Sequence, residues 1–177
     1  MKILNLHGYQ AKAENGCYDA LKKCGYEVFA PQIDYEKQSP QELLALLTKA
    51  YQENHCEAVT GSSMGGFFGM QIAVKMKCRA VLINPCLNPF QTLPELGFDN
   101  KEFILEYIKL FSNLAELDFS QTFAIIGEKD DIVTTHPVIK YLLGEKHCVL
   151  VPDGGHQSSS LPMEEIFKKY GTLFFSK

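Results

Sequence analysis

A five-residue segment, Gly61-Ser62-Ser63-Met64-Gly65, has the G-x-S-x-G pattern that can present a serine hydroxyl as a nucleophile. An apolar run precedes it, and a run with helical spacing of apolar residues follows it. A sharp strand-to-helix turn crowds the residues two before and two after the serine, and glycine tolerates that crowding. Ser63 has glycine at both positions, whereas Ser62 has Thr60 and Met64. The pattern therefore predicts that Ser63 is the nucleophile.

Three other polar segments also follow apolar runs that we interpret as strands. They are His7-Gly8-Tyr9, Gly127-Glu128-Lys129-Asp130-Asp131 and Pro152-Asp153-Gly154-Gly155-His156. In an open parallel sheet the carboxyl ends of the strands share one edge, and ligands bind there. We therefore expect these segments to gather beside Ser63, although they span most of the sequence. A serine hydroxyl needs such a neighbouring base before it can attack a carbonyl carbon.

The elements that must position these residues alternate along the chain. Strands are predicted at 3–6, 27–30, 56–61, 80–83, 123–126 and 148–151, and helices at 17–23, 39–54, 64–77, 138–143 and from 162 onward. Runs such as 80–83 are apolar without alternation, which is typical of strands covered on both faces. This order predicts an α/β fold: a doubly wound, mainly parallel sheet of about six strands, in a single domain over 1–177.

The segment 85–121 departs from this alternation. It begins with turn-forming residues and continues into an apolar stretch from Phe103 to Leu114. We interpret it as a helical, cap-like insertion within the domain. Because its apolar residues cover more than one stripe, the helix either packs deeply or faces a pocket, or it forms an interface in a homo-oligomer.

Composition excludes several classes of function. The net charge of −4 argues against a nucleic-acid partner. Arg79 is the only arginine, which disfavours a heavily anionic substrate. Asn5 and His7 interrupt the first apolar run, and no apolar run reaches 18 residues, so we expect neither a signal peptide nor a membrane span. The six cysteines include no C-x-x-C pair, and we interpret them as reduced thiols of a cytoplasmic protein.

The chain resembles the α/β-hydrolase superfamily in the order Ser, Asp, His of these residues. The segment Gly127-x-x-Asp130-x-x-Val133 resembles the family's signature after strand five, Gly154-Gly155-His156 its histidine loop, and Leu6-His7-Gly8-Tyr9 its oxyanion loop. The first strand already carries the oxyanion loop, so two N-terminal strands of the usual eight are missing. The likeness is to the compact bacterial serine esterases that begin at this point.

This resemblance implies a triad of Ser63, His156 and Asp130. His156 would act as base and then as acid, Asp130 would orient its ring, and the backbone N–H groups of Tyr9 and Met64 would form the oxyanion hole. The implied activity is hydrolysis of small carboxylic esters, or thioesters, through an acyl-enzyme. Water and three side chains suffice, so we expect a small-molecule ester as the partner and no metal or organic cofactor. The alternative is a catalytically retired hydrolase fold acting as a binding or scaffold protein.

Some assignments stay open at this level. Spacing from the preceding glycine favours Asp130, but Asp131 is either a solvated neighbour or the true triad acid. Among the other histidines, His7 would sit under the oxyanion loop and hold it by hydrogen bonds. His136 stands at the start of a helix, where a capping or exposed role competes with a place at the rim of the pocket.

Overall fold

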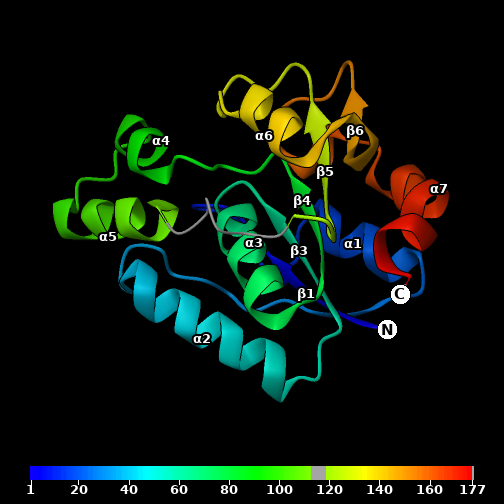
Figure 1. The fold of residues 1–177 in the computed structure, drawn as a ribbon, viewed down its shortest axis with the longest axis horizontal. Coiled ribbons are helices and arrows are strands. Elements are labelled where there is room, and N and C mark those ends of the chain that lie inside the picture. Colours follow the sequence, from blue (N-terminus) through cyan, green and yellow to red (C-terminus); the bar gives the residue numbers. More distant parts are fainter. Residues whose placement is uncertain (113–118, 177) are drawn as a thin grey trace.

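The computed structural model describes residues 1–112 and 119–176, and within them a six-stranded sheet is flanked by helices on both faces (Figure 1). The strands are β1 (Lys2–Leu6), β2 (Glu27–Phe29), β3 (Ala58–Ser62), β4 (Arg79–Ile83), β5 (Thr122–Gly127) and β6 (Cys148–Val151). All neighbouring strands pair in parallel, in the order β2-β1-β3-β4-β5-β6. This confirms the predicted fold class and strand number.

The helices lie in two layers. They are α1 (Gly16–Lys23), α2 (Pro40–Glu53), α3 (Met64–Met76), α4 (Pro89–Glu95), α5 (Lys101–Ser112), α6 (His136–Leu143) and α7 (Met163–Phe175), with short 3-10 turns η2 (Glu145–His147) and η3 (Ser158–Ser160). The helices α1 and α7 cover one face, and α2, α3 and α6 cover the other. Strand residues alternate between the two cores, so Ile3 packs with α1 and α7 whereas Leu4 packs with α2 and α3.

The chain reverses its winding between β1 and β3. The strand order runs outward to β2 on one side of β1 and to β3, β4, β5 and β6 on the other. In doubly wound sheets the crevice for ligands forms at this switch point, beyond the carboxyl ends of the strands. We call that side of the sheet, formed by the loops after β1, β3, β4, β5 and β6, the carboxyl edge.

The sequence around Ser39 accounts for the start of α2. Ser39 accepts a hydrogen bond from the N–H of Glu42, and the Glu42 carboxylate accepts one from the N–H of Ser39. Pro40 occupies the first turn, where its missing N–H costs nothing. This capping box, read from the sequence, fixes the start of α2.

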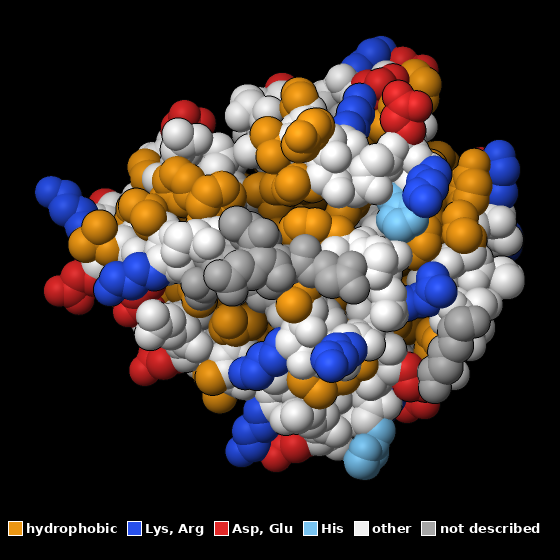
Figure 2. All heavy atoms as spheres, viewed as in Figure 1, with side chains coloured by type: hydrophobic (Ala, Val, Ile, Leu, Met, Phe, Trp, Pro, Cys, Tyr) orange, Lys and Arg blue, Asp and Glu red, His pale blue; other side chains and the backbone are white. Residues whose placement is uncertain are grey.

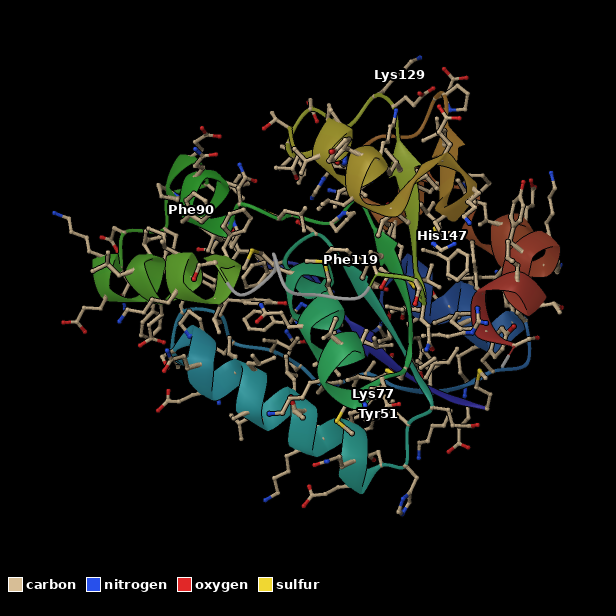
Figure 3. The ribbon with its side chains drawn as sticks, viewed as in Figure 1. Tyr51, Lys77, Phe90, Phe119, Lys129 and His147 are labelled. Carbon is tan, nitrogen blue, oxygen red and sulfur yellow. The ribbon has the colours of Figure 1, made fainter. Side chains whose placement is uncertain are left out.

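The described part of the insertion 85–121 forms α4 and α5. Tyr107 and Leu110 of α5 are buried against the core, whereas Leu105, Ile108 and Phe111 are exposed. Hydrophobic side chains gather over this part of the surface (Figure 2). The ring of Phe90 on α4, labelled in Figure 3, lies 5.3 Å from that of Phe111, centroid to centroid. Leu114, which was expected to end the apolar stretch, lies outside the described residues.

Candidate active site

The turn between β3 and α3 holds Ser63 in a strained backbone conformation. Its φ is +52° and its ψ −117°, values that a residue with a side chain rarely adopts. A β-carbon on Gly61 would overlap the carbonyl oxygen of Gly65, and one on Gly65 would overlap that of Leu6. The two glycines are therefore required by close backbone contact. The predicted elbow lies at Ser63 and not at Ser62, as the spacing indicated.

His7 holds the loop after β1 through both ring nitrogens. Nδ1 donates to the carbonyl of Gly8 at 2.7 Å, and Nε2 accepts from the N–H of Ile33 at 2.8 Å, which defines a neutral ring. Burial lowers the pKa of His7, and the hydrogen bond to the Gly8 carbonyl opposes this only in part. The hydroxyl of Tyr35 donates to the His7 carbonyl at 2.5 Å. His7 thus has the loop-holding position expected of it.

Two backbone amides near Ser63, those of Tyr9 and Met64, have no hydrogen-bond acceptor among the described residues. Among the hydrogen bonds of residues 1–112 and 119–176, none is donated by the N–H of Tyr9 or of Met64. Met64 begins α3, where the first N–H groups of a helix have no partner within the helix. Neither amide is committed to a partner among the described residues, as the predicted oxyanion hole requires.

Asp130 follows β5 and is the acidic residue that meets His156. Its Oδ2 atom lies 2.9 Å from His156 Nδ1 and also 2.9 Å from His136 Nε2. Its Oδ1 atom accepts from the amides of Ile132 and Val133. Burial alone raises the pKa of this carboxyl, but these hydrogen bonds more than offset it and hold the pKa well below its usual value. Asp131, the competing candidate, is exposed.

Asn84 fixes the loop that carries His156, and sequence reasoning missed it. Its side-chain amide donates to the carbonyls of Gly155 and His156, each at 2.9 Å, and its Oδ1 atom accepts from the N–H of Gly127 at 2.7 Å. The residue is fully buried with a φ of +42°. A usable signal existed: Asn84 directly follows a buried strand, as the other polar segments do.

Ser63 and His156 line one cavity of about 570 Å³. Within the described residues the structure records no hydrogen bond between their side chains, and such bonds are often long before substrate binds. The walls come from the segments after β1, β3 and β6 and are of mixed polarity, formed by residues 8–12, 14–16, 62, 63 and 156–159. No residue of α4 or α5 is among them, so the described part of the apolar stretch, from Phe103 to Ser112, does not line this cavity.

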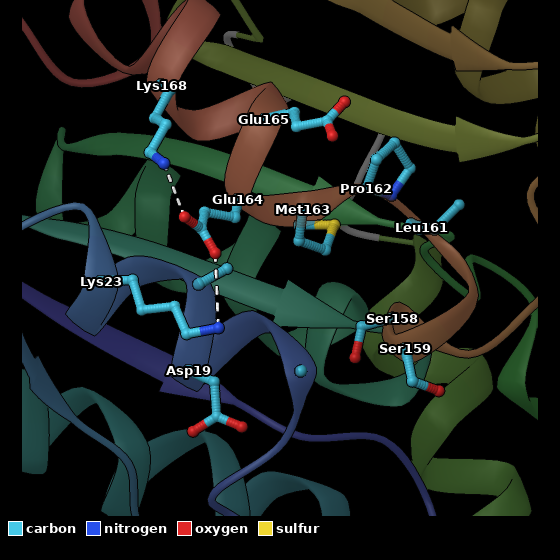
Figure 4. A pocket seen from close by; sticks show the side chains of 12 residues that line it. Asp19, Lys23, Ser158, Ser159, Leu161, Pro162, Met163, Glu164, Glu165 and Lys168 are labelled. Carbon is cyan, nitrogen blue, oxygen red and sulfur yellow. Dashed lines mark hydrogen bonds and ion pairs between the residues drawn. The ribbon is translucent and has the colours of Figure 1, made fainter.

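A second hollow of about 470 Å³ lies between α1 and the start of α7 (Figure 4). It shares Gly16, Ser158 and Ser159 with the cavity at Ser63. Lys23 pairs with Glu164, which also pairs with Lys168, so three of the charged groups that line this hollow are bound to one another. Neither Ser63 nor His156 lines it.

The described residues offer no metal centre. Within 1–112 and 119–176, no three histidine, cysteine, aspartate or glutamate side chains are grouped to hold a metal ion. Lys129 beside the site pairs with the exposed Asp153 at 2.6 Å (Figure 3). No helix in the described part of the chain combines the length and hydrophobicity needed to cross a membrane.

Comparison with known proteins identifies the family of this chain. Residues 2–124 match the model of the Uncharacterised protein family (UPF0227). A search of curated proteins found no match.

Solved structures share the whole fold. An alpha/beta hydrolase enzyme from the metagenome of sediments of the Mar Chica lagoon is 17% identical, with a TM-score of 0.67 over 98% of this chain and 90% of that one. An esterase from Pyrococcus furiosus is 22% identical, with a TM-score of 0.63 over 98% and 80% of the two chains. The esterase domain of a Rhodothermus marinus protein is 15% identical, with a TM-score of 0.67 over 97% and 85%. The chain therefore has a minimal α/β-hydrolase fold.

Proposed function

This chain belongs to the Uncharacterised protein family (UPF0227) and has the α/β-hydrolase fold, and from that premise we propose that it is a serine hydrolase of small carboxylic esters or thioesters. The observation that carries the proposal is a single cavity that contains a strained serine and a histidine bonded to a buried carboxylate. The fold alone hosts many activities, so the proposal depends on these side chains.

The proposed reaction begins at Ser63. As its Oγ atom attacks the carbonyl carbon of the ester, His156 Nε2 takes the hydroxyl proton, and the carbonyl oxygen becomes an anion. The N–H groups of Tyr9 and Met64 stabilise that anion. Asp130, held ionised, stabilises the imidazolium through His156 Nδ1. The C–O bond to the alcohol then breaks, and His156 gives its proton to the leaving oxygen.

Water completes the cycle. His156 takes a proton from a water molecule, whose oxygen attacks the acyl carbon and forms a second tetrahedral intermediate. The bond to Ser63 breaks, His156 returns the proton to Oγ, and the carboxylic acid leaves. The positive end of α3 points at the anion in both steps.

The cavity walls favour a short substrate. Gln10, Lys12 and Gln157 offer hydrogen bonds, and no cluster of large aliphatic side chains lies among the wall residues. A long alkyl chain would gain little by burial there, since that gain is proportional to the apolar area removed from water. Acetyl or similarly short acyl esters of polar alcohols are therefore the substrates that fit best.

A labelling experiment tests the nucleophile. We expect a fluorophosphonate probe to modify Ser63, and Ser63→Ala to abolish labelling and to lower kcat by about 10⁴–10⁶-fold on nitrophenyl acetate. Ser62→Ala is the matched control, because the Ser62 hydroxyl is buried without a hydrogen-bond partner among the described residues and little is lost with it. Equal losses in the two variants would contradict the assignment, and a pure protein that neither labels nor turns over esters would favour a binding role.

A further inference from the structure

The Asp130 carboxylate accepts more hydrogen bonds than a triad needs. The amides of Ile132 and Val133 donate to Oδ1 at 2.9 and 3.0 Å. Oδ2 lies 2.9 Å from His156 Nδ1 and 2.9 Å from His136 Nε2. The side chain is completely buried, so these four donors take the place of water around the charge.

His136 serves no other partner. Its side chain is 12% exposed, and its Nδ1 atom is buried without a hydrogen bond among the residues that the structure describes. Nε2 carries the proton that it donates to the carboxylate, whereas Nδ1 has no partner. The single hydrogen bond that the ring makes among the described residues therefore goes to Asp130.

His136 also stands apart from the substrate. It begins α6, where the following Pro137 favours the first helical turn, and it is not among the residues that line the cavity at Ser63. Asp130 lies between the two rings and bonds both. His136 can thus influence the reaction only through the carboxylate.

We propose that His136 is a positioning residue, which holds Asp130 Oδ2 where its remaining lone pair meets His156 Nδ1. This inference rests on the proposed function, because it assigns a task only if His156 is the base. Without the His136 donor the amides of Ile132 and Val133 still hold Oδ1, but Oδ2 keeps only its bond to His156, so the imidazole is less firmly oriented. A misplaced base slows the chemical step but leaves substrate binding unchanged.

Two variants with opposite expectations test the proposal. His136→Phe keeps a ring and removes the donor, and we expect kcat to fall by about 10-fold or more with KM within twofold of the parent. His136→Gln places an amide N–H near the position of Nε2, and we expect it to restore kcat to within about threefold. Thermal unfolding of each variant is measured alongside.

Each possible result either supports or overturns the proposed role of His136. Equal loss of kcat in both variants, or a rise in KM with kcat unchanged, would overturn the positioning role. If His136→Phe does not fold, His136→Asn replaces it, because the shorter asparagine side chain cannot reach Oδ2. Equal activity of His136→Asn and His136→Gln would then overturn the proposal. Ser63→Ala in the same assay distinguishes a failure of this inference from a failure of the proposed function. If Ser63→Ala is inactive but His136→Phe is fully active, only this inference fails, whereas an active Ser63→Ala removes the proposed function itself.

Discussion

The carboxyl edge and the insertion 85–121 are held in place by different forces. At the carboxyl edge, hydrogen bonds of His7, Asn84 and Asp130 tie separate loops together. In the described part of the insertion, α4 and α5 are held mainly by apolar side chains such as Leu93 and Tyr107. Hydrogen bonds depend steeply on direction, whereas apolar packing depends mostly on volume.

This difference shows that an apolar stretch in the sequence does not by itself indicate a wall of the cavity beside Ser63. The sequence left deep packing, a pocket wall or an interface open for the stretch from Phe103, and its described side chains pack on the core or lie exposed on the surface. The cavity beside Ser63 is lined instead by loop residues of mixed polarity. Substitutions at the carboxyl edge should therefore change the reaction, and matched substitutions elsewhere should change stability at most.

The largest effect is expected at the elbow. In Gly65→Ala the new β-carbon would overlap the carbonyl oxygens of Leu6 and His7, which are backbone atoms that cannot move away cheaply. We expect either no folded protein or a fall in kcat/KM of about 10²-fold or more, because Ser63 is displaced. The assay is nitrophenyl acetate hydrolysis, with circular dichroism to report folding.

Gly69→Ala is the control on the same helix. Its β-carbon would meet Val59 and Leu82 at 3.5 and 3.7 Å, which is ordinary contact, and alanine favours a helix interior by up to about 1 kcal/mol. Unchanged activity and an equal or higher melting temperature are expected. Wild-type activity in Gly65→Ala would show that the close contact at the elbow is not required.

An intermediate effect on the reaction is expected at Asn84, and Asn88 in the insertion is its control. Asn84→Gly removes three hydrogen bonds but suits the φ of +42°, and we expect kcat/KM to fall by about 10²-fold as His156 loses its position. Asn88→Ala in the insertion removes contacts with Gln91 and Thr92 and should cost about 1 kcal/mol of unfolding free energy with kcat/KM within twofold. Kinetics and urea unfolding of both variants test this contrast. Equal losses of kcat/KM in Asn84→Gly and Asn88→Ala would contradict it.

The smallest effect is expected on the exposed face of α5. Leu105 is 59% exposed, so Leu105→Ser should change the free energy of unfolding by less than about 0.5 kcal/mol. The ratio of nitrophenyl acetate to nitrophenyl octanoate hydrolysis should stay constant, since α5 does not line the cavity. A selective loss of octanoate hydrolysis would instead place the insertion at the substrate.

Strong local patterns made most of the fold predictable. The capping box at Ser39 and the glycines around Ser63 fix their turns within five residues, so neighbours in sequence decide the structure there. The buried strand β4 could be read from its uninterrupted apolar run. The exposure of one face of α5 could not, because it depends on which elements pack against the helix.

The sequence by itself determined the strand-turn-helix at Ser63, the order of Ser63, Asp130 and His156 along the chain, and the parallel sheet that brings their loops to one edge. Only the tertiary structure decided that Asp130 rather than Asp131 meets His156, that His136 donates to the same oxygen, and that Asn84 holds the histidine loop. The reason is physical: spacing along the chain fixes where a backbone turns, whereas a hydrogen bond between distant loops depends on ångström-scale placement that only the packed core supplies.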